Sequence, residues 1–357
     1  TTRLDQVGNS DGALSNRNMV INGAMQVAQR GTSATTFAYG TVDRFRPSEG
    51  STSSLAITQT QDTNAPSGFS NSLKITVNTA ETMSGSKQLA VFHAMEAQNL
   101  QQLGYGTSDA QSITVSFWVK SSVTGAYCLS LYENDDNRNI GATYTINSAN
   151  TWEYKTITFP PDTVGVIDSN NGAGLETYFF LSVGPDRKTA DNTSWATWSA
   201  ARFGYGQVAD VAGTTNATWQ ITGVQLELGD TATPFEHRSY GEELAKCQRY
   251  YYMLASGLNK SLPTGSYYSS SLVTTTVQFP VTMRSAPTLD SISGSEYYGI
   301  YSNSGFDGFT HFTSTGRAQI SGITLDANGS GASGTVGFSG PMKTNNANAY
   351  VALDAEL

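Results

Sequence analysis

The side chains best suited to chemistry in this sequence are aromatic rings set among small polar residues. Trp195 and Trp198 lie in the stretch TSWATWSAARFGYG. A second group near the end of the chain comprises Tyr297, Tyr298, Tyr301, Phe306, Phe309 and Phe312. An exposed ring can stack on the C–H face of a sugar while neighbouring Asn, Asp and Ser side chains bind its hydroxyls. Both groups are therefore candidate ligand-binding or receptor-binding residues, and the alternative for each is a sheet core or a subunit contact.

Catalytic patterns are missing from the sequence. No HExxH or phosphate-binding loop occurs, and Gly329, Gly331 and Gly334 lack the strand-to-helix context of a dinucleotide-binding loop. None of the three histidines has a neighbour at metal-ligand spacing. Two carboxylates for glycoside hydrolysis need only be close in space, so the sequence leaves a glycan hydrolase open as an alternative. We expect a binding protein without catalytic residues, and not an enzyme.

One acidic cluster is a candidate metal site. Glu133, Asp135 and Asp136 stand close together, and Ca²⁺ prefers several hard oxygen ligands in a loop. The alternative is a solvated hairpin, and no other cofactor is expected. Cys128 and Cys247 have no metal-ligand spacing, so we expect two reduced, buried thiols.

Strand patterns recur along the whole chain. Ile113, Val115, Phe117 and Val119 alternate with other residues in the clearest case, and about ten such runs without intervening long helices favour a β-sandwich. A jelly-roll arrangement hides strand edges well in a chain of this size. After Tyr250 the sequence becomes richer in Ser, Thr, Gly and Asn and again shows short strand patterns.

The predicted fold is therefore all-β: a jelly-roll-like β-sandwich, a short helix and a second, smaller β-sandwich. The predicted parts are an N-terminal arm at 1–17, the first β-domain at 18–234, a linker with a short helix at 235–250, and a C-terminal β-domain at 251–357.

The junction between the two domains lies in the stretch Trp219–Tyr252. Its strand pattern is interrupted by Gly223, which suggests a β-bulge, and Ser239 with Glu242 three residues later predicts a capped helix start. Apolar residues then recur at spacings of four and three, which predicts a short seam between chains. The seam candidates are Tyr240, Leu244, Cys247, Tyr251 and Leu254. An alternative is that the aromatic run from Tyr250 starts a strand and shortens the seam.

Charge and hydropathy narrow the range of partners. Charged residues make up 14% of the chain and the net charge is −9, without a visible basic patch. This balance argues against nucleic acid and against an anionic membrane surface. No apolar run is long enough to span a bilayer, so no membrane insertion is expected.

Several long stretches resemble one family. GVQLELGDTATPFEHRSYGEELAKCQRYY, MVINGAMQVAQRGTS, VDRF, SITVSFWVKSSVTGAY and NTWEYKTITFP occur in this chain. Together they resemble tail-fibre and other virion appendage proteins of tailed bacteriophages, with a β-sandwich like that of carbohydrate-binding modules. The resemblance covers roughly residues 18 to 252.

This resemblance implies a structural protein of the virion, located in the tail or another external appendage and made in the host cytoplasm. It implies a homotrimer, docking to other virion tail proteins through the N-terminal region, and host attachment through a surface glycan or protein receptor. The alternatives are a carbohydrate-binding module outside a virion and an appendage enzyme that degrades polysaccharide. Because loops on a rigid β-scaffold often carry specificity, we expect host contact in the C-terminal domain.

Overall fold

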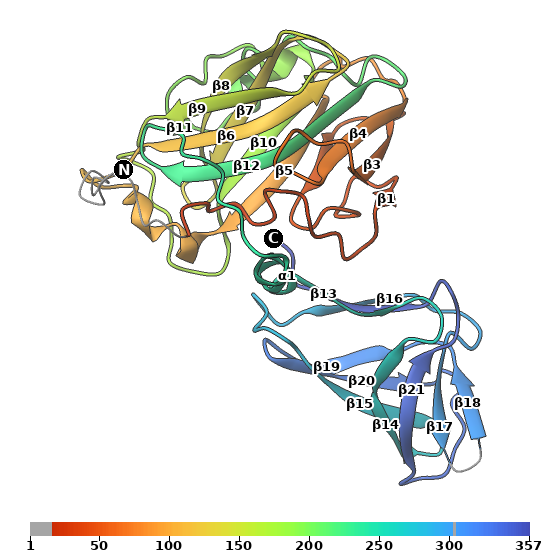
Figure 1. Cartoon of the computed structure of the whole chain (residues 1–357). Helices are drawn as coiled ribbons and strands as arrows, with labels where there is room; N and C mark the ends of the chain where they lie inside the picture. Colours follow the sequence, from red (N-terminus) through yellow and green to blue (C-terminus); the bar gives the residue numbers. More distant parts are fainter. Residues whose placement is uncertain (1–15, 303–304) are drawn as a thin grey trace. The chain divides into compact units, whose positions relative to one another are not determined.

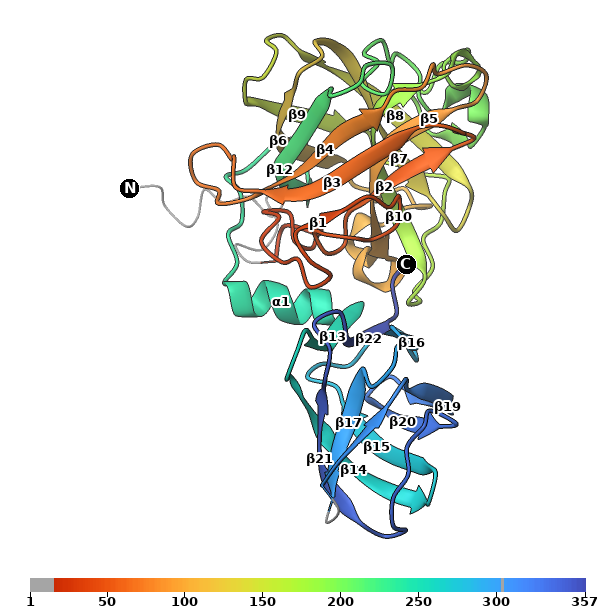
Figure 2. The same ribbon diagram turned by 90° about the vertical axis from the view of Figure 1, so that its right-hand side faces the viewer.

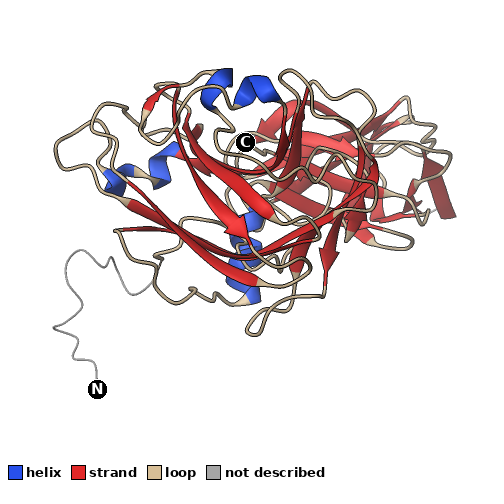
Figure 3. Ribbon diagram, turned by 90° about the horizontal axis from the view of Figure 1, so that it is seen from above, coloured by secondary structure: helices blue, strands red, loops and turns tan. Residues whose placement is uncertain are grey.

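The computed structural model describes residues 16–302 and 305–357 (Figure 1). Most of the predicted arm at 1–17 lies outside these residues. The chain divides into two compact units between Glu243 and Leu244, inside the segment 235–250 expected to link the domains. Figure 3 shows strands predominating and helices confined to short segments, so the all-β prediction is confirmed. Among the described residues, no helix has the length and apolar character needed to cross a membrane.

The first unit consists of two antiparallel sheets, each with six strands among the described residues. Sheet A has the order β1 (Ser33–Ala34), β3 (Ala56–Asp62), β4 (Ser72–Thr79), β12 (Thr218–Leu228), β6 (Ile113–Ser121) and β9 (Glu153–Phe159). Sheet B has the order β11 (Ala196–Thr197), β8 (Arg138–Ile146), β7 (Gly125–Glu133), β10 (Ala173–Val183), β5 (Gln88–Glu96) and β2 (Arg46–Gly50). Figure 2 shows the short β1 beside β3 at one edge. Short 3₁₀ helices occupy Ala97–Asn99, Gln101–Leu103, Pro185–Arg187 and Ala200–Arg202.

The core of this domain lies between the two sheets. Alternate residues of β6, including Val115 and Phe117, meet alternate residues of β7 and β10, including Leu131 and Phe179. The rings of Phe117 and Phe179 contact edge to face at 5.1 Å between centroids. The resulting β-sandwich leaves the opposite faces of both sheets available for other roles.

The buried thiols and His93 belong to the structure of their domains. Cys128 and Cys247 are both reduced, buried thiols, as expected from the sequence. His93 is buried on β5, where its Nε2 accepts the N–H of Ile21 at 3.3 Å. Burial, reinforced by the nearby Arg44 charge, holds the pKa of His93 well below its usual value. His93 is therefore a neutral core residue.

The predicted bulge in β12 is confirmed. The pairing of β12 with β6 shifts register between Thr222 and Gln225, and Gly223 has a φ of 63°. Before the bulge, Thr218 to Ile221 pair with β4. After the bulge, Val224 donates its N–H to the carbonyl of Gly23 at 2.9 Å. The segment 18–23 therefore replaces β4 as the neighbour of β12 on this side.

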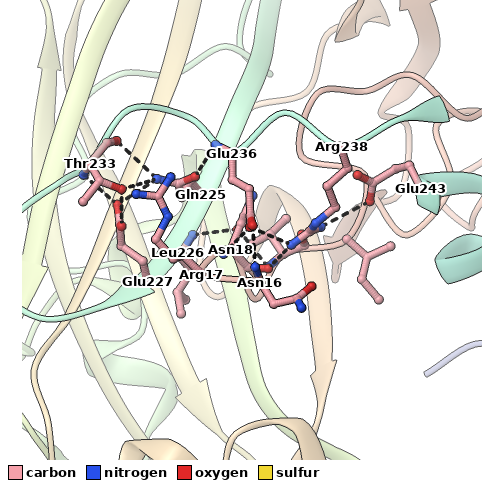
Figure 4. A network of polar contacts seen from close by, with 12 residues as sticks. Asn16, Arg17, Asn18, Gln225, Leu226, Glu227, Thr233, Glu236, Arg238 and Glu243 are labelled. Atoms are coloured by element: carbon pink, nitrogen blue, oxygen red, sulfur yellow. Dashed lines mark hydrogen bonds and ion pairs between the residues drawn. The ribbon is translucent and has the colours of Figure 1, made fainter. Parts of the chain in front are cut away.

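A polar network joins the start of the described chain to the segment that leaves β12 (Figure 4). Glu236 accepts the N–H of Asn18 at 2.9 Å, and the Arg238 guanidinium donates to the carbonyls of Asn18 and Val20. Glu243 accepts the N–H of Asn22 at 2.5 Å. Two of the stretches that carry the family resemblance therefore serve to close this domain.

Helix α1 (Tyr240–Gln248) begins at the predicted cap, because the Ser239 hydroxyl accepts the N–H of Glu242 at 3.3 Å. Beyond this helix the structure matches the alternative for the seam, in which the aromatic run starts a strand and shortens it. Tyr251 and Leu254 lie on strand β13 (Tyr251–Ser256), where Tyr251 pairs with Asp354, and only Tyr240, Leu244 and Cys247 remain helical. The aromatic run Tyr250–Tyr252 favours a strand over a helix, which explains the early end.

The second unit contains two antiparallel sheets in the described residues. The smaller has the order β13, β22 (Tyr350–Asp354) and β16 (Thr288–Ser291). The larger has the order β18 (Gly305–Phe309), β17 (Tyr298–Ser302), β21 (Ser339–Thr344), β14 (Ser261–Ser269), β15 (Leu272–Gln278), β20 (Gly322–Asn328) and β19 (Thr313–Gln319). The core of the second unit draws on both sheets, and it includes Val273 on β15, Leu325 on β20 and Val351 on β22.

Candidate functional site

The outer face of sheet B gathers aromatic and polar side chains from neighbouring strands. Residues opposite one another in paired strands share a face. Arg46 lies opposite Phe92, Phe92 opposite Tyr178, and Tyr178 opposite Ser130, which makes one row across β2, β5, β10 and β7. In the next row, Glu176 lies opposite Tyr132. The intervening residues point into the core, so these rows face away from sheet A.

A continuous series of rings crosses this face. Tyr178 lies 5.1 Å from Phe92 and 4.7 Å from Phe203 between ring centroids. Tyr132 lies 6.2 Å from Phe203 and 6.4 Å from Trp198. Phe92 and Phe203 are buried, whereas Tyr132, Tyr178 and Trp198 are half-buried. The three half-buried rings, which reach solvent, therefore pack against the two buried phenylalanine rings.

A loop after β10 brings Trp198 and Phe203 onto the sheet. Ser130 on β7 donates its hydroxyl to the carbonyl of Phe203 at 2.5 Å, and Gly141 on β8 donates its N–H to the carbonyl of Asn192 at 2.7 Å. A Cβ at Gly141 would meet the Asn192 side chain at 2.1 Å, so glycine permits this close approach. The loop thus lies over the outer face of β7 and β8. Tyr178 on β10 lies at the edge of this loop, next to Phe203.

Hydrogen-bonding groups flank the rings. Glu176 accepts a hydrogen bond from Tyr178 Oη at 2.8 Å and another from Asn134 Nδ2 at 2.5 Å. Burial raises the pKa of Glu176, against the effect of these hydrogen bonds and of the Arg46 charge. Tyr132 donates to Asn137 Oδ1 at 2.9 Å. The carboxylate is therefore held in a fixed position beside two rings.

Arg46 closes the other side of this face. Its guanidinium lies 4.4 Å from the centroid of Phe92 and 5.7 Å from that of Tyr39, which are distances for cation–π contact. We call the half-buried set on this face the sheet B platform. It consists of Arg46, Tyr132, Asn134, Glu176, Tyr178 and Trp198. The platform can stack on an apolar ring face and exchange hydrogen bonds with hydroxyl groups around it.

The two predicted tryptophans have different positions. Trp198 belongs to the platform. Trp195 packs against the main core, with its ring edge to face with Tyr105 at 5.7 Å, and its Nε1 donates to the carbonyl of Pro160 at 2.8 Å. The indole of Trp195 thus holds a loop in place and lies outside the platform, and its role in ligand binding stays a prediction.

Three of the predicted aromatic residues in the second domain are core residues. Tyr298, Phe309 and Phe312 are buried and contact one another through their rings. The Tyr298 hydroxyl is near the carbonyls of Ile292 and Tyr350, both at 2.7 Å. Their prediction as ligand-contacting residues is therefore wrong, because the inward side of each strand takes them into the core. Tyr297 is half-buried and packs against the same core.

Tyr301 and Phe306 remain accessible, with 45% and 39% of their surfaces exposed. They are cross-strand partners on β17 and β18, with ring centroids 5.1 Å apart. Lys343 on β21 lies 5.1 Å from the Phe306 ring and donates to Asn259 Oδ1 at 2.8 Å. This pair is a smaller candidate contact surface in the second domain.

The calcium candidate consists of one buried and two exposed carboxylates. Glu133 accepts the N–H of Asp136 at 3.0 Å, Asp136 accepts that of Val166 at 2.8 Å, and Asp135 accepts that of Asp168 at 2.9 Å. Each carboxylate thus has a backbone partner within the loops. Across residues 16–302 and 305–357, no group of three or more His, Cys, Asp or Glu side chains is arranged to hold a metal ion.

Most of the platform was missed in the sequence. Tyr132, Glu176 and Tyr178 alternate with the core residues Leu131, Leu175 and Phe179 along β7 and β10. That alternation was a usable signal, because a Tyr or Glu on the non-core face of a strand is exposed unless another layer covers it. Arg46 carries no such signal, since β2 is short and its pairing with β5 is a long-range contact.

The sequence matches no protein-family model and no curated protein. Among solved structures, it is similar to the enzymatically active domain of tailspike protein 4 of bacteriophage CBA120, with a TM-score of 0.34 and 13% identity over 59% of this chain. The match spans 21% of that phage chain, about a fifth of its length.

Carbohydrate-binding modules are also similar. A family 11 module of a Clostridium thermocellum cellulase has a TM-score of 0.30 and 10% identity, covering 57% of this chain and 98% of the module. A tandem family 22 module from Paenibacillus barcinonensis has a TM-score of 0.29 and 7% identity, covering 97% of this chain and all of that chain (100%). At these TM-scores and identities, the similarities assign neither a family nor a function to this chain.

Proposed function

We propose that this chain is a structural protein of a bacteriophage virion, a tail fibre or similar appendage, that attaches to the host surface by binding glycan. The sheet B platform is the observation that carries the glycan-binding part. Tyr132, Tyr178 and Trp198 offer half-exposed rings, and Glu176 and Asn134 stand beside them with fixed hydrogen bonds. Rings with flanking polar groups are suited to sugars, whose two faces are apolar and whose rims carry hydroxyls.

The mechanism is attachment without chemistry. A sugar ring stacks on Tyr178, its hydroxyls donate to Glu176, and Arg46 donates to its oxygens. A single site of this kind binds weakly, but several copies on one particle give strong attachment through multivalency. We accordingly propose no catalytic residue.

The virion context rests on the family-like stretches of the sequence. Residues 18–23 are held within the first domain, so we assign docking to other tail proteins to the part of the chain before Asn16, outside the described residues. We also propose a homotrimer, made in the host cytoplasm and carried on the tail or another appendage. Light scattering at micromolar concentration tests the trimer, with an expected mass of three times 38.1 kDa. A monomer mass would contradict it.

Substitution on the platform tests the function. Tyr178→Ala removes a half-buried ring and its hydrogen bond to Glu176, so binding to purified host-envelope polysaccharide in affinity electrophoresis should fall at least about tenfold, equivalent to about 1.4 kcal/mol. Tyr268→Ala is the matched control, because Tyr268 is exposed in the second domain. Equal retardation of the two variants would refute the platform as the glycan site.

A carbohydrate-binding module outside a virion would use the same platform and differs only in its context. Electron microscopy of particles labelled with antibody against the chain separates the two, since an appendage protein must appear on the tail. A polysaccharide-degrading enzyme would instead release reducing sugar from the same envelope material, and we expect none from purified protein.

A further inference from the structure

The outer face of sheet A carries a second group of rings, on the opposite side of the sandwich from the platform. Trp118 on β6 lies opposite Tyr154 on β9, with ring centroids 5.4 Å apart. Lys120 follows Trp118 by two residues and so shares its face, and its Nζ lies 5.1 Å from the ring of Trp152. We call Trp118, Lys120, Trp152 and Tyr154 the sheet A square.

The square is accessible and is not part of the core. Tyr154 is 46% exposed, and the other three side chains are half-buried. Their neighbours along the strands, including Phe117, Val119 and Ile157, are the residues that enter the core. In the described part of the chain, β9 is an edge strand of sheet A, so no further strand pairs with it on the outer side of Tyr154.

Lys120 is a cation held by neutral groups. Its Nζ donates to Asn64 Oδ1 at 2.6 Å, and the same oxygen accepts the Trp152 Nε1–H at 3.0 Å. Asp62, the carboxylate that acts on Lys120 electrostatically, is paired with Lys74 at 3.1 Å. Burial lowers the pKa of Lys120, with Asp62 opposing this effect and Lys74 adding to it. A partly desolvated ammonium without a contacting carboxylate gains from an added anion.

We propose that the sheet A square is a second saccharide-binding surface, selective for sugars that carry a carboxylate, such as uronic acids. The sugar ring stacks on Tyr154 and Trp118, and its carboxylate pairs with Lys120. Stacking alone would accept any pyranose with an apolar face, whereas the cation adds the preference for an acidic one. This site is separate from the sheet B platform, so its test does not depend on the outcome of the test of the proposed function.

Charge argues for this ligand over a symmetric contact between two copies. A twofold contact through this face would place Lys74 and Lys120 of both copies in one interface, where the like charges repel. An acidic saccharide supplies the opposite charge instead. The chain carries a net charge of −9, whereas this face brings two lysines, Lys74 and Lys120, together with one carboxylate, Asp62.

Calorimetric titration with oligogalacturonate tests the proposal, and fully methyl-esterified oligogalacturonate is the control ligand, since it keeps the sugar and loses the charge. The full-length chain should bind the acid more tightly than the ester. Tyr154→Ala and Lys120→Gln should each raise Kd about tenfold, because one removes the stacked ring and the other the charge. Added salt should weaken the parent chain's binding more than that of Lys120→Gln.

Three further variants serve as controls for the specificity of oligogalacturonate binding. Tyr154→Phe retains the ring, Lys343→Gln removes a ring-associated lysine in the second domain, and Tyr178→Ala alters the platform; each should bind oligogalacturonate like the parent. The proposal is overturned if the parent does not distinguish acid from ester, or if Tyr178→Ala loses binding and Tyr154→Ala does not. It is also overturned if Tyr154→Ala changes only the mass in light scattering, which would make the square a subunit contact.

Discussion

Asn18 and Leu226 lie 208 residues apart in the sequence and are joined by a hydrogen bond between the Asn18 side chain and the Leu226 backbone. The Asn18 side chain accepts the N–H of Leu226 at 3.1 Å, and the neighbouring Met19 donates its N–H to the Leu226 carbonyl at 2.9 Å. Asn18 Nδ2 also donates to Val224 at 3.0 Å. One amide side chain thus replaces the strand partner that β12 loses at its bulge, where backbone groups would otherwise be buried without partners.

Asn18→Ala should therefore destabilise the first domain strongly. The substitution leaves the Val224 carbonyl and the Leu226 N–H without this partner in a buried place, at about 1–3 kcal/mol for each unsatisfied group. Urea unfolding followed by tryptophan fluorescence measures the loss. Asn78→Ala is the control, because Asn78 is exposed and donates to Thr58 at 2.8 Å across two strands. Equal losses in both variants would show that the Asn18 contacts do not support β12.

A second prediction concerns acid stability and rests on Glu81. Its carboxylate accepts a hydrogen bond from Lys87 Nζ at 2.6 Å and others from the backbone N–H groups of Ser53, Ser54 and Leu55. The Lys87 contact and these backbone donors hold the pKa of Glu81 well below its usual value of 4.5. A depressed folded-state pKa stabilises the fold above the unfolded value, and this contribution is lost as the pH falls.

Glu81→Gln should thus lower the unfolding midpoint at pH 7, and the gap to the parent chain should shrink as the pH is lowered below about 4.5. Thermal unfolding at a series of pH values gives the gap directly. Glu242→Gln, at an exposed residue in the first turn of α1, should show a much smaller gap at pH 7. A gap for Glu81→Gln that does not change with pH would mean that the carboxylate charge is not what these donors stabilise.

The contribution of Glu133 to the stability of the fold should change with pH in the opposite direction to that of Glu81. Burial raises its pKa to about 7, and the charges of Asp136 and Asp135 add to the effect. A raised folded-state pKa gives a contribution that is complete below the unfolded value of 4.5 and is lost as the pH rises through about 7. Glu133→Gln should therefore be more stable relative to the parent chain at pH 8 than at pH 5.

The same pair of proteins tests the calcium candidate. A bound Ca²⁺ would favour the ionised carboxylate and so would stabilise the parent chain at pH 8 but not Glu133→Gln. Thermal unfolding with CaCl₂ and with a chelator separates the two cases. A midpoint that is the same in both solutions for the parent chain would remove Glu133, Asp135 and Asp136 as calcium ligands.

The sequence was informative where one residue type has one physical role. Gly223 interrupts an alternating strand, and Ser239 with Glu242 begins a helix, and both predictions match the structure. The all-β fold followed from alternation in the same way. The end of α1 was harder, because the apolar spacing continued through Tyr251 and Leu254 while the pairing of β13 with β22 decided the conformation.

The candidate sites were harder because alternation shows which residues share a face but not which face is covered. Tyr298 and Tyr301 both lie on β17, yet the first is in the core and the second is exposed. The sheet B platform was harder to predict than the surface on β17, because Arg46 and Tyr178 share a row only through their separate pairings with Phe92 on β5. Strand register across more than a hundred residues is not written in any local pattern.

The last prediction divides the proposed functions between the two domains. Phage particles carrying the chain truncated after Leu254 should assemble but adsorb less, if the Tyr301–Phe306 surface contributes host contact as expected from the sequence. Particles with the intact chain and Tyr178→Ala should also adsorb less, because multivalent attachment depends steeply on the affinity of each site. Adsorption rate constants to host cells measure both, and Tyr268→Ala particles serve as the reference. If truncation leaves the rate unchanged while Tyr178→Ala lowers it, host contact belongs to the first domain alone. If neither change lowers it, the attachment role proposed for this chain is wrong.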